Sequence, residues 1–245
     1  MSLVRKAWRR YSSDGLSGLS RNGYYFLRRR FQIPVRGAIN WARLRASGEY
    51  AALANPLKPI AVDPNQITYK STADFSKRRD IGRVVGGDWD RGRRAFSETV
   101  RFNAIEKRFV EGCTWEETGI IDYHRRKMEE YDGAFQHDGC LSLKDVRVRY
   151  RAIDEMYESM KTNGYDESKA LHRYDHPYVH IGRDGELLHA SVGNHRVAVA
   201  KVLDLESIPV FIVVRHEEWQ RRREEVVSGD GDVSTDEHPD LKGLV

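Results

Sequence analysis

The sequence lacks a long apolar run: none of its 245 residues falls in a stretch approaching the roughly 18 consecutive apolar residues that a membrane-spanning helix needs. The charged first ten residues are not followed by an apolar segment, so no secretory signal peptide is expected. Its two cysteines, Cys113 and Cys140, lie far apart and form no CxxC pair, so cysteine alone cannot build a zinc site or a disulfide framework. These absences predict a cytoplasmic protein with ordinary thiols.

Acidic residues are scarce in the first fifty positions. This segment contains eleven Lys and Arg but only two acids, Asp14 and Glu49, and so has a local charge of +9. Residues 226–245 have the opposite charge, because they contain five acids and one basic residue, Lys242. The whole chain carries a net charge of +4. The basic excess is almost all arginine, densest at Arg28–Arg30, and arginine suits bidentate phosphate contacts. The segment predicts an anionic partner, such as nucleic acid, anionic lipid or an acidic protein. The alternative is a solvated arm whose aromatic residues pack on the main domain.

Composition divides the chain into three parts. Residues 1–54 read as a basic helical arm that ends near two prolines, and residues 55–227 as one α/β domain. Residues 228–245 are polar, acidic and contain glycine, which predicts a disordered tail.

Hydrophobic periodicity predicts the elements of the domain. A strand leading into a turn is expected at 60–69, with Asp63-Pro64-Asn65 as the turn residues, and a short strand at 81–85. The turn residues Asp184-Gly185 predict a type I′ hairpin. The apolar, β-branched run from Ile208 to Val214 predicts a fully buried strand. The remaining predicted elements are helices around 102–109, 114–131, 146–163, 197–205 and 217–225, and hairpin strands at 178–181 and 186–190.

Gly193-Asn194-His195-Arg196 stands between a predicted strand and a predicted helix. Glycine permits a sharp turn with close ligand approach, and the first amides of a helix, with the macrodipole behind them, bind phosphate. Arg196 can clamp the phosphate, His195 can donate a hydrogen bond or act as an acid or base, and Asn194 can contact the ligand. The alternative is a helix capped by Asn194, with Arg196 in a surface ion pair.

The segment from Tyr150 to His216, with an early block at Ile60–Pro64, resembles the ParB/sulfiredoxin superfamily in about 80 residues. Four blocks match the family in order. They are a helix with its terminal glycine at 153–164, the hairpin turn at 183–187, the glycine motif at 193–196, and the segment leading into the last strand at 203–210. The motif falls where ParB-type proteins carry G-E-R-R and sulfiredoxins carry G-C-H-R. The resemblance implies a mixed α+β sheet with a helical insertion at about 72–148, and nucleotide-phosphate contacts for Gly193, Asn194, His195 and Arg196.

Two departures narrow the activity that the resemblance implies. Asn194 replaces the cysteine that sulfiredoxins use, which disfavours sulfinic acid reduction. Only about 30 residues follow Val214, too few for the helix-turn-helix domain of partition proteins. Other members of the fold phosphorylate small molecules such as free serine.

Carboxylates outside the motif are candidates for metal binding and catalysis. Asp88 and Asp90 lie two apart, so in an extended segment both face one side and could hold Mg²⁺ beside a nucleotide; the alternative is pairing with neighbouring arginines. Glu158 is a candidate general base on the helix before the hairpin, or a solvated helix-face charge. His180, His189 and His195 do not have a recognised metal-ligand spacing.

The sequence therefore predicts a nucleotide-binding protein that uses ATP or CTP with Mg²⁺, and an NTP-dependent phosphotransferase or NTPase is its enzymatic form. His195 and Glu158 are the catalytic candidates and a small hydroxyl compound the acceptor. Two alternatives stay open: a DNA-associated ParB-like regulatory or nuclease protein, and a non-catalytic protein that docks a partner through the basic arm.

Overall fold

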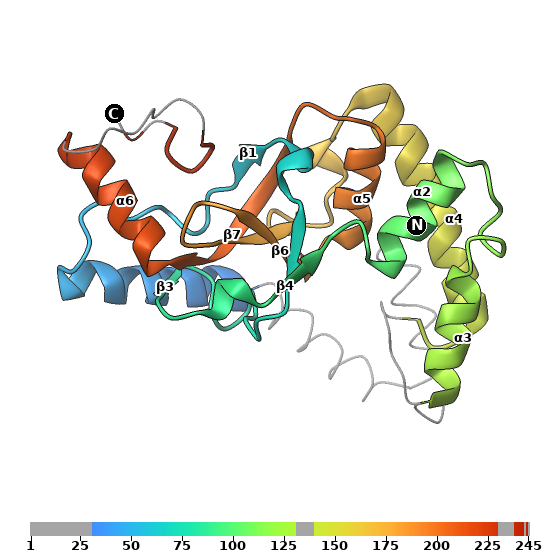
Figure 1. Cartoon of the computed structure of the whole chain (residues 1–245), viewed down its shortest axis with the longest axis horizontal. Helices are drawn as coiled ribbons and strands as arrows, with labels where there is room; N and C mark the ends of the chain where they lie inside the picture. The colour runs from blue at the N-terminus through green and yellow to red at the C-terminus, as the bar shows by residue number, and fades with distance from the viewer. Residues whose placement is uncertain (1–30, 131–139, 230–237, 243, 245) are drawn as a thin grey trace.

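The computed structural model describes residues 31–130, 140–229, 238–242 and 244. Within these ranges the chain has a mixed α/β fold with six α-helices and an open, mixed, seven-stranded sheet (Figure 1). None of the helices there combines the length and the apolar character needed to cross a bilayer. The basic cluster Arg28–Arg30 lies outside the described residues.

The sheet has the strand order β1-β7-β5-β6-β2-β4, and β3 pairs with β7. β7 pairs antiparallel with β1 and parallel with β3 and β5, so it contacts three other strands of the sheet. The strands are β1 (Ile60–Val62), β2 (Tyr69–Ser71), β3 (Arg83–Val85), β4 (Arg93–Ala95), β5 (Tyr178–Ile181), β6 (Leu187–Val192) and β7 (Ile208–His216).

β7 is buried on both faces, as its continuous β-branched run predicts. Val210 and Ile212 belong to the larger apolar cluster, which includes side chains of α2 to α5. Phe211 and Val213 point to the other face, where a smaller cluster includes Ile33. The strand thus joins two cores across the sheet.

Helices lie at both ends of the molecule (Figure 1). Residues 31–47 are helical and lie near α6 (Glu217–Ser228) at one end of the sheet. Toward the other end lie α2 (Val100–Phe109), α3 (Ile120–Glu130), α4 (Leu143–Asn163) and α5 (Asn194–Val202). The periodic apolar stripes predicted helices in the regions of α2, α3 and α4, and the structure confirms them.

Side-chain caps set the starts of two of these helices. The side chain of Thr99 accepts a hydrogen bond from the backbone N–H of Phe102 at the start of α2, and Ser142 caps α4 in the same way. α4 stops at Gly164, whose φ of 67° is readily available only to glycine.

The segment 60–69 was expected to be a strand with turn residues at Asp63-Pro64-Asn65. The structure has a 3₁₀ turn there, Pro64–Gln66 capped by Asp63, and it separates two strands, β1 and β2. The region expected as a helical insertion also contributes β3 and β4 to the sheet.

The hairpin turn also differs from the type I′ expectation. The backbone N–H of Gly185 donates to Gly182 O at 3.1 Å, so Arg183 and Asp184 are the central residues. A type I′ turn needs positive φ at both central positions, whereas here only Gly185, after them, has a positive φ of 92°.

Residues 238–242, within the segment for which composition predicted disorder, pack against the domain. Asp240 is buried between Arg215 of β7 and Arg223 of α6, with N–O distances of 2.6 and 2.8 Å, and it also accepts a hydrogen bond from Trp219 Nε1 at 3.0 Å. Leu241 packs into the larger core beside them. Arg215, Arg223 and Asp240 are named the tail cluster below. Residues 230–237 lie outside the described part of the chain.

Candidate phosphate site at the start of α5

The turn that leads into α5 requires glycine. Gly193 has a φ of 82°, and a Cβ atom there would lie 2.7 Å from the Cα of Pro177. Ser191, two residues earlier, also has a positive φ, of 60°. The backbone therefore turns sharply between β6 and α5, as the motif predicts, and packs closely against the segment before β5.

A buried histidine holds this turn in place. The backbone N–H of Ser191 donates to His189 Nδ1 at 3.2 Å, so the ring carries its proton on Nε2 and donates it to Val192 O at 3.1 Å. Burial, together with the charge of Lys70, lowers the pKa of His189 to about 3, so the ring is neutral at physiological pH. His189 is thus a positioning residue for the motif, a role that its sequence spacing did not reveal.

No side chain caps the amino terminus of α5. Asn194, the expected cap, instead donates from Nδ2 to Ser191 O at 3.2 Å. An uncapped first turn presents backbone amides and the positive end of the helix macrodipole, which together favour an anion.

Arg196, in the first turn of α5, is fixed by Asp175. Its Nη2 lies 2.8 Å from Asp175 Oδ2, and its Nη1 donates to the backbone oxygen of the same residue. Burial opposes both charges, yet this pairing raises the pKa of Arg196 and lowers that of Asp175, so both stay ionised. The two side chains remain 26% and 25% exposed, so solvent and solutes can reach the pair.

Lys77 adds a second cation to this cluster. It comes from the loop before β3, and its Nζ lies 4.5 Å from the centre of the Tyr178 ring. Burial lowers the pKa of Lys77 to about 8, Asp175 opposes the shift, and Arg196 adds to it. Lys77, Arg196 and Asp175, named the α5 cluster below, carry a net charge of +1 when Lys77 is protonated. The polar loop around Lys77 has no motif, so Lys77 was not a candidate in the sequence.

His195 points to a different side of α5. It is 7% exposed, and its ring centre lies 5.7 Å from that of Tyr150 on α4, within the core. Glu158 is exposed on α4 and makes no polar contact with the described residues of the motif. The catalytic roles of these two residues stay predictions.

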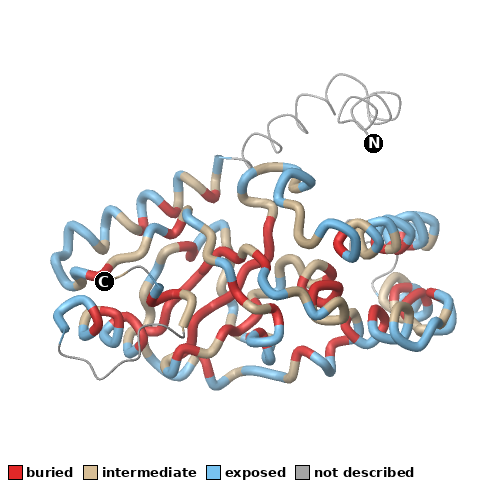
Figure 2. Tube along the Cα trace, turned by 90° about the horizontal axis from the view of Figure 1, so that it is seen from above, coloured by how far each residue is buried: buried red, intermediate tan, exposed pale blue. Residues whose placement is uncertain are grey.

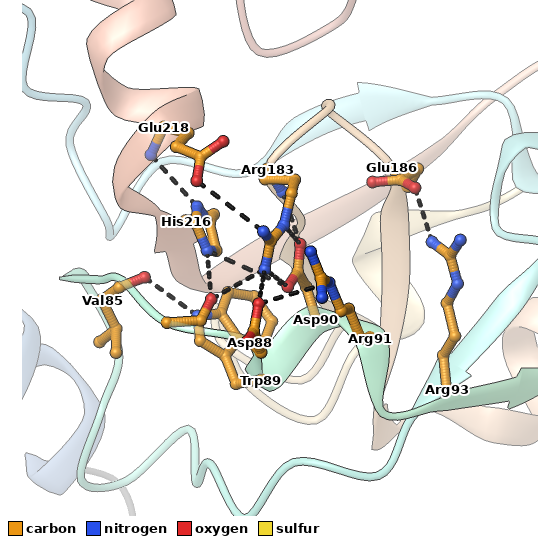
Figure 3. A network of polar contacts seen from close by, with 11 residues as sticks. Val85, Asp88, Trp89, Asp90, Arg91, Arg93, Arg183, Glu186, His216 and Glu218 are labelled. Carbon is orange, nitrogen blue, oxygen red and sulfur yellow. Dashed lines mark hydrogen bonds and ion pairs between the residues drawn. The ribbon is translucent and has the colours of Figure 1, made fainter.

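Asp88 and Asp90 lie in a separate network around Arg183, at the tip of the β5–β6 hairpin (Figure 3). Arg183 Nη2 lies 2.8 Å from Asp88 Oδ1 and 2.8 Å from Asp90 Oδ1, and its Nε bonds Asp90 Oδ2 at 2.9 Å. Burial favours protonation of Asp90, but the hydrogen bonds from Arg183 hold its pKa well below the usual range. His216 Nε2 donates to Gly87 O at 2.7 Å and closes the network.

This network bears on the Mg²⁺ prediction. Asp88 also pairs with Arg91 at 3.3 Å, as the neighbouring-arginine alternative expected, whereas the main partner, Arg183, is distant in sequence. Within the described ranges, no group of three or more His, Cys, Asp or Glu side chains could hold a metal ion. A metal role for Asp88 and Asp90 stays a prediction. In the structure both carboxylates bind Arg183 and so hold the tip of the β5–β6 hairpin.

Comparison with known proteins adds no relative, since no family model, no curated protein and no solved structure matches this chain.

Proposed function

We propose that the chain binds the phosphate groups of a nucleoside triphosphate, ATP or CTP, at the first turn of α5. The observation that carries the proposal is the α5 cluster beside a helix start that no side chain caps: Arg196 pairs with Asp175, and the charges of both influence Lys77. Asp175 neutralises only one of the two positive charges, and a bound phosphate group would neutralise the other.

The arrangement around the motif supports a ParB/sulfiredoxin-like assignment. The hairpin β5–β6, the glycine turn, α5 and the parallel partner strand β7 follow in the order that the resemblance implies. Gly193 occupies the left-handed turn position, and Arg196 projects from the first helical turn toward a charged cluster.

The enzymatic form of the proposal, phosphoryl transfer to a small hydroxyl compound, rests on the same ligands. Positioning and charge neutralisation dominate such reactions, and Arg196 with Lys77 would supply both. Mg²⁺ would enter with the nucleotide, because this ion is often held by substrate phosphates and one or two carboxylates. The binding step is therefore the part to test first.

The test is a thermal-shift panel of the full chain with ATP, CTP, GTP and ADP, each with and without Mg²⁺. A nucleotide at about 100 times its Kd adds about 2.7 kcal/mol to the free energy of unfolding, which a melting curve resolves. We expect Arg196→Ala to abolish the shift. Arg125→Ala is the matched control, because it removes the same charge from an exposed pair with Asp122 on α3 and should retain the shift. If no nucleotide at millimolar concentration stabilises the wild type, the proposal fails.

A further inference from the structure

The helix at residues 31–47 turns an apolar stripe outward. Phe31, Val35 and Ile39 are 57%, 54% and 38% exposed, and they recur every four residues. Residues four apart lie one above another on a helix, so the three side chains form one line. Ala42 and Ala46, both exposed, continue the same face. Exposed apolar residues aligned in this way are typical of a binding surface, whereas scattered ones are not.

The opposite face of the helix is fixed to the sheet. Ile33 is 3% exposed and belongs to the smaller core. Asn40 Nδ2 donates to the backbone oxygens of Ile81 at 2.9 Å and Arg79 at 3.2 Å. A Cβ atom on Gly37 would lie 2.8 Å from Leu57 Cδ2, so the helix packs closely there. These contacts set the rotation of the helix, which lies at the margin of the molecule (Figure 2).

Arginines lie along both sides of the stripe. At about 100° per residue, Arg36 and Arg43 fall on one side of the Phe31–Ile39 line and Arg45 on the other. No acidic residue occurs from Gly15 to Gly48, a segment with seven arginines. The face is therefore apolar in the middle and cationic at its edges.

We propose that this face docks on the surface of an anionic phospholipid bilayer. Phe31, Val35 and Ile39 would enter the boundary between headgroups and acyl chains, and the flanking arginines would contact lipid phosphates. A nucleic acid would use the arginines but offers no hydrocarbon for Val35 and Ile39. The stripe therefore favours lipid among the anionic partners that the charge predicts. The proposal is independent of nucleotide binding at α5.

Vesicle flotation of the full chain tests the proposal. The protein is mixed with vesicles of phosphatidylcholine alone, or of phosphatidylcholine with phosphatidylglycerol, at low and high salt. We expect flotation with the anionic vesicles only, weakened by salt, because two signals act together. The triple variant Phe31→Ser/Val35→Ser/Ile39→Ser should lose at least tenfold in affinity.

The matched control is Val110→Ser/Leu141→Ser/Leu171→Ser, which removes three apolar side chains that are 65%, 63% and 75% exposed elsewhere on the molecule. It should float like the wild type, and thermal unfolding should show that both triple variants fold. Equal binding by the stripe variant, or no flotation of the wild type, would overturn the proposal. So would a wild-type dimer that the stripe variant dissociates, because the face would then contact a second copy.

Discussion

The tail cluster and the α5 cluster each place two cations beside one aspartate, but they differ in burial. In the tail cluster the three side chains are 2% to 7% exposed, and Asp240 accepts hydrogen bonds from Arg215 and Trp219 and forms an ion pair with Arg223. In the α5 cluster, Arg196 and Asp175 are about one quarter exposed and lie beside an uncapped helix.

The difference shows how one set of charges can serve two purposes. In the tail cluster, backbone oxygens and a tryptophan complete the hydrogen bonding, so the ions fasten the end of the chain to β7 and α6. In the α5 cluster, the surroundings add a helix dipole of positive sign, which leaves a demand for an anion. Burial and saturation of the partners, more than charge count, separate a structural clamp from a ligand site.

The largest expected effect comes from breaking the tail cluster. Asp240→Ala would leave two buried arginines without their carboxylate and should lower the free energy of unfolding by about 3–5 kcal/mol. Urea denaturation measures the change. Asp122→Ala, which removes an exposed carboxylate from α3, should have little effect.

Equal stability of the two variants would contradict the clamp. A loss of the nucleotide response in folded Asp240→Ala would contradict it too, since the tail cluster has no part in the proposed nucleotide binding.

Acid should weaken the protein through its buried histidines before its carboxylates titrate. Burial lowers the pKa of His189 to about 3 and that of His180 to about 4, whereas an unfolded histidine titrates near 6.5. The unfolded chain then binds more protons, so stability is complete above about pH 6.5 and falls as the pH drops. Each ring contributes a slope of about 1.4 kcal/mol per pH unit.

Urea midpoints measured at intervals from pH 8 to pH 4.5 test this slope. Burial opposes ionisation of Asp240, but its arginines hold its pKa near 2, so its contribution is lost only below about pH 4. His189→Gln should reduce the slope of the unfolding free energy against pH by the contribution of one histidine, about 1.4 kcal/mol per pH unit. A flat profile in the wild type would show that the two histidines are not buried in neutral form.

The smallest expected effect sharpens the role of Lys77. With a pKa of about 8, Lys77 loses its charge as the pH rises from 7 to 9, and phosphate affinity should fall with it, by at most roughly tenfold per pH unit. Calorimetric titration over this range measures the fall. Lys77→Arg keeps its charge and should bind with little pH dependence. A wild-type affinity independent of pH would remove Lys77 from the site.

Periodic, local features were predictable from the sequence. The stripe of α4 and its stop at Gly164, the β-branched run of β7, and the glycine turn at Gly193 all depend on neighbouring residues, and the structure contains each of them. β4 is three residues long, too short for a period to show, and it was missed.

Long-range pairings could not be predicted in the same way. Arg183 binds Asp90 across 93 positions, and Asp240 reaches Arg215 across 25. Composition predicted a disordered tail because a charged residue such as Asp240 is usually exposed to solvent. Only the folded structure places Arg215 and Arg223 beside it. Lys77 gave no signal for the related reason that only the folded loop places it near Arg196.

Hydrogen–deuterium exchange of the full chain, with and without the nucleotide that gives the largest thermal shift, tests the central claim most directly. Bound phosphate would occupy the first amides of α5, so we predict slowed exchange in peptides covering residues 189–197, and no such change in Arg196→Ala. Protection confined to other parts of the chain, with residues 189–197 unchanged, would place the nucleotide elsewhere and contradict the account.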